Sequence, residues 1–223
     1  KLASSGLDRV TVSLDAIEDE IVQEISNSSI SSNDIIEGIK AALENGLEVK
    51  VNTVIIKNYN EHQIIPITER FSEMGVSVRF IEYMDVGGTK NWNPEQVVFG
   101  DEIRTIIATR FGRLKPLKQQ KYGEVANRWS LGNGYEIGFI ESISKPFCQS
   151  CTRARISANG KLYTCLFSER GYDLKSLITM GADIKDLRDA VIALWGKRDD
   201  RYSELRAVQQ VVTNPVEMHF IGG

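Results

Sequence analysis

The chain has 223 residues, 42% of them hydrophobic and 26% charged, which is the composition of a globular protein long enough to bury a sizeable core. Its net charge of -3 provides no field that would gather nucleic acid or an anionic membrane surface, so we expect neither as a partner. The sequence contains no apolar run of about eighteen residues and does not begin like a signal peptide, which indicates a cytoplasmic protein.

The first third of the sequence alternates between strand and helix patterns. A short strand at 10–14 is followed by a long loop, and then by a helix with an N-cap at 32–34 and an end at Gly46. Further strands are predicted at 47–56 and 76–83, with a helix at 60–74 between them. This alternation is typical of βαβ units and predicts an α/β fold with a parallel sheet.

Residues 1–86 are predicted to form part of an incomplete TIM-type barrel, because polar side chains lie near the ends of its strands. The strand at 10–14 would have no earlier neighbour, so its outer backbone groups would lie open at the edge of the sheet. The chain starts at Lys1 and enters a strand almost at once, and we therefore expect it to be the C-terminal part of a longer protein.

Residues 87–223 differ in character and are predicted to form a second, α+β region. Its predicted elements are a helix from Asp101 to Phe111, short antiparallel strands within 129–167, and helices at 173–180 and 183–197. Asn159 and Gly160 mark a turn, which predicts a hairpin that pairs 153–157 with 162–165.

Three cysteines lie close together in this second region. Cys148 and Cys151 are separated by two residues, and Cys165 lies on the far arm of the predicted hairpin. Three cysteines cannot all pair, and a reducing compartment favours metal ligation over a disulfide. Three interpretations stay open from the spacing alone: structural zinc with His219 or another fourth ligand, a [4Fe-4S] cluster with one open iron, and a redox pair of Cys148 with Cys151.

Four basic residues stand where they could hold an anion. Arg153 and Arg155 alternate on a predicted strand, so their side chains point the same way and could clamp phosphates; the alternative is a solvated strand face. Lys50 and Arg79 lie within strands that should be buried on both faces. They either form ion pairs, with Glu82 as one candidate partner, or point into the barrel and bind an anion.

Four further positions carry no signal of their own. A serine at a strand end, such as Ser13, usually caps, and a methionine such as Met84 usually belongs to a core. Gly222 and Gly223 form either a frayed end or a tail that threads where side chains would not fit.

Taken together, several segments resemble the MoaA-type GTP 3',8-cyclases, the radical SAM enzymes of the first step of molybdenum cofactor biosynthesis. The segments are GLDRVTVSLD, AALENGLEVKVNTVI, VRFIEYMDVGG, CQSCTRARISANGKLYTCLF and the closing IGG. The similarity extends over essentially the whole chain, and the Cys-x-x-Cys-x-Arg-x-Arg run with a distant third cysteine and a terminal Gly-Gly is its most specific part. The family implies an incomplete radical SAM barrel, followed by a region that carries a second [4Fe-4S] cluster.

The resemblance also implies roles for individual residues. The ligands of the second cluster, whose open iron meets the guanine base of GTP, would be Cys148, Cys151 and Cys165. The residues that bind GTP would be Lys50, Arg79, Arg153 and Arg155. The residues that line the SAM pocket would be Ser13 and Met84. The residues needed for turnover would be Arg153, Arg155, Gly222 and Gly223.

The sequence departs from the family in one respect, since it contains no Cys-x-x-x-Cys-x-x-Cys motif. That motif holds the SAM cluster, so we expect the full-length bacterial parent to be an active lyase and this chain alone to be inactive. In the family, a 5'-deoxyadenosyl radical from SAM takes the hydrogen from C3' of GTP, and the carbon radical attacks C8 to give 3',8-cyclo-7,8-dihydro-GTP. The resemblance adds an electron-donor protein, a homodimer and a downstream cyclic pyranopterin synthase as partners. The alternatives are a radical SAM peptide-modifying enzyme with an auxiliary cluster and a non-enzymatic zinc-binding module.

Overall fold

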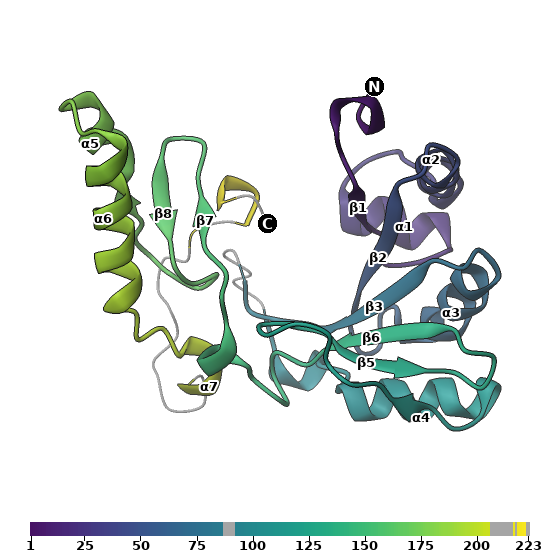
Figure 1. Cartoon of the computed structure of the whole chain (residues 1–223). Helices are drawn as coiled ribbons and strands as arrows, with labels where there is room; N and C mark the ends of the chain where they lie inside the picture. The colour runs from purple at the N-terminus through teal and green to yellow at the C-terminus, as the bar shows by residue number, and fades with distance from the viewer. Residues whose placement is uncertain (87–91, 206–215, 217, 222–223) are drawn as a thin grey trace. The chain divides into compact units, whose positions relative to one another are not determined.

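The computed structural model describes residues 1–86, 92–205, 216 and 218–221, which belong to two compact units (Figure 1). Unit 1 comprises Lys1–Met84 and Asn93–Lys145, and unit 2 comprises Asp85–Trp92 and Pro146–Gly223. The predicted domain boundary at residue 86 stays a prediction. None of the helices in the described ranges has both the length and the apolar character needed to cross a membrane.

Unit 1 is built on a six-stranded mixed sheet of order β1-β2-β3-β6-β5-β4. Its strands are β1 (Arg9–Ser13), β2 (Glu48–Ile55), β3 (Ser77–Glu82), β4 (Lys115–Pro116), β5 (Asn127–Ser130) and β6 (Glu136–Ile140). β1, β2, β3 and β6 pair in parallel, whereas β5 pairs antiparallel with β6 and β4 antiparallel with β5. The predicted α/β class is confirmed, and the incomplete barrel stays a prediction.

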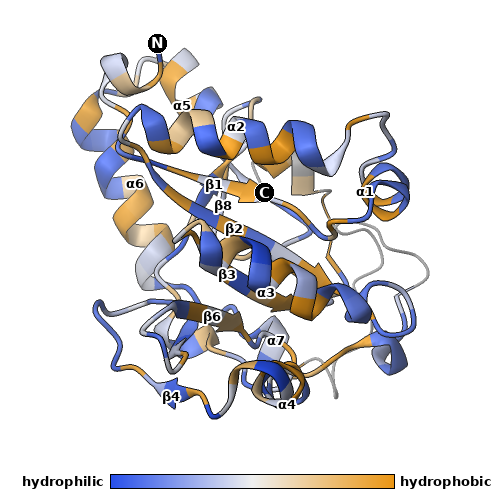
Figure 2. Ribbon diagram, turned by 90° about the vertical axis from the view of Figure 1, so that its right-hand side faces the viewer, coloured by the Kyte–Doolittle hydropathy of each residue, from blue (hydrophilic) through white to orange (hydrophobic). Residues whose placement is uncertain are grey.

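The helices of unit 1 cover one face of this sheet (Figure 1). They are α1 (Asp19–Ser26), α2 (Ser32–Glu44), α3 (Ile64–Glu73) and α4 (Gly100–Phe111), with short 3-10 turns η1 (Ala3–Ser5), η2 (Glu61–Gln63) and η3 (Pro94–Gln96). Every second residue of β2, from Val49 to Ile55, is buried beneath them in the core. The colours of α2 in Figure 2 show the alternation of polar and apolar residues that lets one side of this helix join that core.

Local signals place the helix ends. Ser31 and Asp34 form a reciprocal capping box at the start of α2, one residue before the predicted N-cap segment. Gly75 follows α3 with a φ of +67°, a left-handed conformation that glycine adopts without steric cost.

Most predicted elements of unit 1 are confirmed, and two expectations are wrong. The segment predicted to be a long loop before residue 32 contains α1, in which Ile21, Val22 and Ile25 stand at helical spacing and Val22 is buried. This helix has only eight residues, which is shorter than the stretch over which a helical period is usually recognised. The strand at 136–140 was expected in an antiparallel region, but β6 also pairs in parallel with β3, as in the register of Arg79 with Gly138. That pairing joins segments far apart in sequence, and no local pattern encodes it.

Unit 2 contains a three-stranded antiparallel sheet and two packed helices. Its elements are η4 (Cys148–Ser150), β7 (Arg155–Ile156), β8 (Lys161–Tyr163), β9 (Tyr172–Asp173), α5 (Leu174–Thr179), α6 (Ile184–Gly196), α7 (Tyr202–Leu205) and η5 (Met218–Ile221). The predicted hairpin is confirmed as β7 and β8, and the two predicted helices are confirmed as α5 and α6, capped by Asp173 and Asp183. Arg153 was expected within the first hairpin strand but precedes it, because β7 starts at Arg155.

Candidate functional site

The three cysteines belong to unit 2 and are all half-buried free thiols. Cys148 starts the 3-10 turn η4, and the Cys151 N–H donates to the Cys148 carbonyl at 3.2 Å, which closes the turn. Cys165 lies two residues beyond β8, and its sulfur accepts a hydrogen bond from the Phe167 N–H at 3.5 Å. The short turn and the hairpin thus bring the expected ligands into the same unit.

Two of the thiols have shifted pKa values. Burial alone would raise the pKa of Cys151, but hydrogen bonds from Arg198 and Arg153 lower it to about 7. Burial raises the pKa of Cys165, and the nearby Cys148 adds to this effect. Of these two thiols, Cys151 therefore loses its proton more readily near neutral pH, as a metal ligand must.

In the described part of the chain, no three His, Cys, Asp or Glu side chains converge as the ligands of a single metal ion. Ligands of one zinc ion all contact the same atom, at about 2.0–2.3 Å. Thiolates that hold a [4Fe-4S] cluster each bind a different iron, so they stand farther apart. The donor set of three free thiols beside cationic side chains fits such a cluster in its chemistry.

Arg153 and Arg155 form a cationic pair next to these cysteines. The Arg153 guanidinium lies 5.0 Å from the centre of the Phe147 ring, and its Nε is buried without a hydrogen-bond partner in the described residues. Burial, followed by the like charge of Arg153, lowers the pKa of Arg155, while the Cys151 and Cys165 thiolates oppose this shift. Arginine stays protonated at neutral pH despite such shifts. Neither residue forms an ion pair with a carboxylate of the described chain, so the groups that oppose their positive charge there are the neighbouring thiols.

In unit 1, Ser13, Lys50 and Arg79 lie on one face of the sheet. Strand register places Ser13 beside Asn52 and Asn52 beside Arg79, and Lys50 lies two residues before Asn52 on the same face. This face is opposite the one that the helices cover, since the residues between these positions on β2 and β3 are the buried ones. The unit therefore gathers its expected ligand-binding side chains on the open face of the sheet.

Lys50 and Arg79 differ in how their charges are compensated. Lys50 forms an ion pair with Glu48 at 2.6 Å, and Glu48 is largely exposed, so this pair contributes little stability. Arg79 forms no ion pair with a described residue, and burial lowers its pKa. Glu82, expected as one candidate ion-pair partner, is instead buried on the helix side, where it accepts hydrogen bonds from the N–H groups of Gly100 and Ser144.

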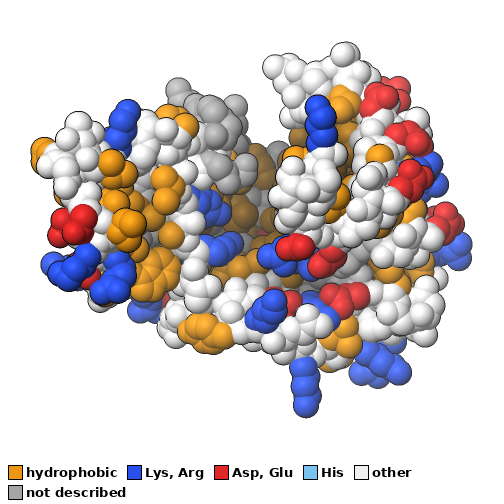
Figure 3. Space-filling view, turned by 45° about the horizontal axis from the view of Figure 1, so that its top comes forward, with side chains coloured by type: hydrophobic (Ala, Val, Ile, Leu, Met, Phe, Trp, Pro, Cys, Tyr) orange, Lys and Arg blue, Asp and Glu red, His pale blue; other side chains and the backbone are white. Residues whose placement is uncertain are grey.

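The structure adds little about the other residues that were expected to belong to the site, which are Met84, Gly222 and Gly223. Met84 is half-buried and is the last residue of the first segment of unit 1. Gly222 and Gly223 lie outside the described residues. Around the visible part of unit 1, Lys and Arg side chains lie next to Asp and Glu side chains (Figure 3), which agrees with the expectation that any anion site is local.

The sequence did not point to Arg198 and Glu204, which both contact the cysteine turn. Arg198 Nη1 donates to the Cys151 carbonyl at 2.5 Å, and Glu204 Oε1 accepts from the Gln149 N–H at 3.3 Å. These contacts join residues that are 47 and 55 positions apart in the sequence. No motif or regular spacing connects such distant positions, so Arg198 and Glu204 could not be identified from the sequence.

Two family models match the chain. Residues 1–71 match the model described as Radical SAM superfamily, and residues 76–204 match the model described as Molybdenum Cofactor Synthesis C. The chain therefore belongs to the Molybdenum Cofactor Synthesis C family.

Curated relatives carry the name GTP 3',8-cyclase. One from Staphylococcus epidermidis is 44% identical over 227 residues, which cover 100% of this chain and 66% of that protein. Another, from Staphylococcus aureus, is 43% identical over 228 residues, which cover 100% of this chain and 67% of that protein. The chain thus spans about two thirds of the length of the curated relatives it matches.

Proposed function

We propose that this chain carries the GTP-binding part of a GTP 3',8-cyclase, an enzyme that joins positions 3' and 8 of GTP during molybdenum cofactor biosynthesis. The observation that carries the proposal is the pair Arg153 and Arg155, which has no carboxylate partner among the described residues and lies beside three free thiols. The family match and the names of the relatives agree with it.

The arginine pair is suited to the triphosphate of GTP. Each guanidinium offers parallel N–H donors that match two phosphate oxygens, and the buried Arg153 Nε is a donor without a partner among the described residues. Phosphates held at fixed donors would restrict the ribose and base to few orientations, which lowers the entropy cost of bringing the reacting carbons together.

The three cysteines fit a [4Fe-4S] cluster because they supply three thiols and leave one iron without a protein thiolate. When bound, the cluster would offer that iron to the guanine base. Cys151 deprotonates near pH 7, and the neighbouring arginines favour its thiolate form. We assign the three ligand positions to Cys148, Cys151 and Cys165.

The open face of unit 1 would serve the other ligand groups. We assign Lys50 and Arg79 to phosphate binding, since phosphate can replace the exposed Glu48 as the partner of Lys50 and Arg79 has no competing carboxylate in the described chain. Ser13 and Met84 would line a SAM pocket in an incomplete radical SAM barrel. The assignment of Gly222 and Gly223 to turnover rests on the family resemblance, as do the electron donor, the homodimer and the downstream synthase.

Metal analysis of the chain tests the cluster. Anaerobic reconstitution with iron and sulfide is expected to give four irons per chain and a broad absorption band near 400 nm, as for cubane clusters in general. Cys148→Ser, Cys151→Ser and Cys165→Ser should each reduce the iron content. One zinc per chain with no colour would contradict the assignment.

Substitution of the arginines tests substrate binding. Arg153→Ala and Arg155→Ala should each weaken GTP binding by roughly 10- to 100-fold, because each removes charged hydrogen bonds of about 1.5–3 kcal/mol. Equilibrium dialysis with labelled GTP measures the affinity, and iron content should stay at the wild-type level. Arg188→Ala, which changes an exposed arginine on α6, is the control. Loss of iron in the two test variants would mean that these arginines are structural.

A further inference from the structure

The turn that carries Cys148 and Cys151 is held from one side by the segment that follows α6. Arg198 reaches the Cys151 carbonyl, and Glu204 at α7 reaches the Gln149 N–H, as described above. These two side chains satisfy the N–H of Gln149 and the carbonyl of Cys151, which both belong to the turn. The segment therefore fixes the backbone of the turn in addition to the hydrogen bond that closes it.

Arg198 is itself held in a defined orientation. Its Nε donates to Asp200 Oδ2 at 3.1 Å, and its guanidinium lies 4.7 Å from the centre of the Trp195 ring. The side chain is only 11% exposed. The Arg198 guanidinium contacts a carboxylate with one edge, an aromatic ring with one face and a carbonyl with one N–H, so it has little freedom to rotate. The compact ammonium group of a lysine could not make all three contacts at once.

Glu204 is fixed in a similar way. Its other carboxylate oxygen accepts from Arg201 Nε at 2.6 Å, and its side chain is 15% exposed. Tyr202 lies in the same segment, between Arg198 and Glu204 in sequence. Its aromatic ring stacks on the ring of Phe167, two residues beyond Cys165, with the ring centres 4.3 Å apart. The segment 198–205 thus contacts both the turn that carries the first two cysteines and the chain just after the third.

We propose that Arg198 is a positioning residue for the cluster held by the three cysteines. Its side chain fixes the backbone at Cys151 and places a positive charge beside the thiolates. The inference rests on the proposed function, because it takes the centre to be a [4Fe-4S] cluster. Residues that orient metal ligands through hydrogen bonds affect how tightly the metal is held, and charges around an iron–sulfur cluster affect its reduction potential.

Two consequences follow from the two roles of Arg198. Without the hydrogen bond to Cys151 the turn loosens, so the cluster should lose iron faster. Without the positive charge the extra electron of the reduced cluster is less stabilised, so the reduction potential should fall. A structural role that concerned only packing would not produce the second effect.

The test uses the chain reconstituted anaerobically with iron and sulfide. Release of iron to a ferrous chelator should be about tenfold faster in Arg198→Ala than in wild type, which is the lower end of the range for residues that orient metal ligands. A redox titration followed by electron paramagnetic resonance should place its potential below the wild-type value. Arg188→Ala, which changes an exposed arginine on α6, should leave both quantities unchanged.

Two conservative variants separate the hydrogen bond from the charge. Arg198→Lys keeps the charge and should stay closer to wild type in potential than in iron release. Arg198→Gln keeps a donor without the charge and should show the opposite pattern. These two variants also decide the question if Arg198→Ala fails to fold, as judged by circular dichroism.

The outcomes distinguish this inference from the proposed function. A wild-type chain that takes up zinc and no iron overturns both. A wild-type chain with an intact cluster, together with Arg198 variants that match it in iron release and in potential, overturns the positioning role alone.

Discussion

At the scale of single residues, Arg79 shows how one small neighbour makes space for a charged side chain. Its register partner on β6 is Gly138, and a Cβ added at Gly138 would come within 3.2 Å of Arg79 Cγ and within 3.3 Å of Ala126 Cβ. The stem of Arg79 therefore lies close against β6 at Gly138, where a side chain would require both neighbours to shift by a few tenths of an ångström. Gly138 thus serves to make space rather than to provide an unusual backbone conformation.

Gly138→Val should displace Arg79 without removing its charge. We expect weaker GTP binding in the iron-loaded chain, with a stability cost of about 1–3 kcal/mol from overpacking. A double-mutant cycle with Arg79→Ala, read out as GTP affinity, measures whether the effect acts through Arg79. If Gly138→Val costs as much affinity in the Arg79→Ala background as in wild type, Gly138 acts by another route.

The residue scale also shows what spacing alone can reveal. The cysteines and the arginine pair lie within a short stretch, so their spacing was enough to predict a metal centre beside an anion site. Glu82 was proposed as a possible ion-pair partner because it follows Arg79 closely in sequence, yet alternation along β3 places the two on opposite faces. Spacing identifies candidates, and only the register of the sheet decides which of them meet.

At the scale of elements, a buried ion pair connects α4 to the end of β6. Arg104 donates to Glu141 Oε1 at 2.8 Å, and its guanidinium lies between the rings of Trp129 and Phe139. The Glu141 side chain is 2% exposed and also accepts from Asn127 at 2.6 Å. Without this carboxylate charge, the exposed Asp101 would be the remaining acidic partner of the buried Arg104 guanidinium among the described residues.

The pair predicts a pH dependence of stability. Burial raises the pKa of Glu141, but hydrogen bonds from Arg104, Asn127 and Lys145 outweigh burial, so the pKa in the folded chain lies below the ordinary value of 4.5. A carboxyl with a lowered folded pKa stabilises the fold fully above its unfolded pKa, and this contribution is lost as the pH falls through the folded pKa.

Urea denaturation of Glu141→Gln measures this contribution. At pH 7 the substitution should lower the free energy of unfolding by about 2 kcal/mol, and the difference from wild type should shrink as the pH falls below 4.5. Glu69→Gln, which changes an exposed pair with Arg110, should have little effect at any pH. A difference that is independent of pH would show that the charge of Glu141 does not matter.

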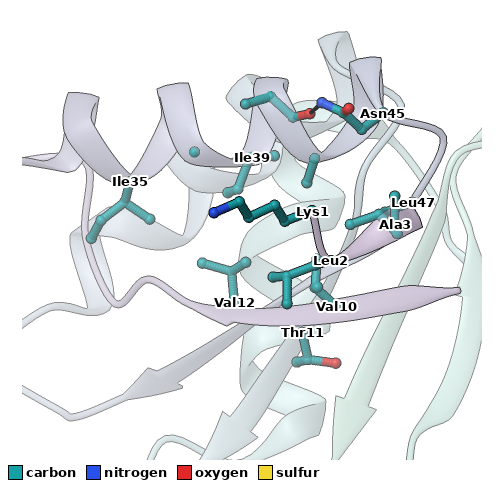
Figure 4. A pocket seen from close by; sticks show the side chains of 13 residues that line it. Lys1, Leu2, Ala3, Val10, Thr11, Val12, Ile35, Ile39, Asn45 and Leu47 are labelled. Carbon is teal, nitrogen blue, oxygen red and sulfur yellow. Dashed lines mark hydrogen bonds between the residues drawn. The ribbon is translucent and has the colours of Figure 1, made fainter. Parts of the chain in front are cut away.

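The first strand presents an open edge, as expected from the sequence. β1 pairs only with β2 in the described chain, and an apolar groove lies between β1 and α2 (Figure 4), where Val10 and Val12 face Ile35 and Ile39. The Leu14 N–H donates to β2, so by alternation the Thr11 N–H points away from the sheet. Backbone groups of this kind can pair with a strand of another molecule.

We therefore expect the purified chain to self-associate through β1. Thr11→Pro should reduce the association measured by light scattering, since proline blocks edge pairing without removing a hydrogen bond of the sheet. Thr11→Val, which retains the N–H, is the matched control. A monodisperse wild-type monomer would contradict the expectation.

The three parallel strands of the first third of the chain and most helices were predictable because their signals are local. Alternating apolar residues marked β1, β2 and β3, and capping residues marked α5 and α6. α1 escaped because its eight residues are too few for a clear period, and the pairing of β3 with β6 escaped because it depends on contacts across a long segment. Local patterns specify elements, whereas the order of strands in the sheet is decided by long-range contacts.

At the scale of the whole molecule, the two units have unequal cores. Most buried apolar side chains of the described chain belong to unit 1 and form one cluster around its sheet. Among the described residues of unit 2, the large apolar side chains that are buried are those of Leu162, Tyr163, Phe167 and Ile221. A domain with so few buried side chains usually needs a disulfide or a metal to be stable, and the three cysteines of unit 2 are free.

The cluster should therefore stabilise unit 2 more than unit 1. Removal of iron from the reconstituted chain is expected to speed hydrogen exchange over residues 146–205 at least tenfold, while the strands of unit 1 stay protected, because metal binding contributes directly to folding. Mass spectrometry of peptic fragments measures this. Equal loss of protection in both units, or none in unit 2, would contradict the expectation.

The parallel pairing of β3 with β6 has a consequence for synthesis on the ribosome. Val78 pairs with Ile137, so 59 residues separate the partners (137 minus 78). At translation rates of about 5–20 residues per second, the outer edge of β3 waits roughly three to twelve seconds for its neighbour to be made. Residues 83–135 must be synthesised in that interval. During this time β3, an apolar strand in the middle of the finished sheet, is still an edge strand. This is therefore the stage at which the nascent chain most needs protection from aggregation.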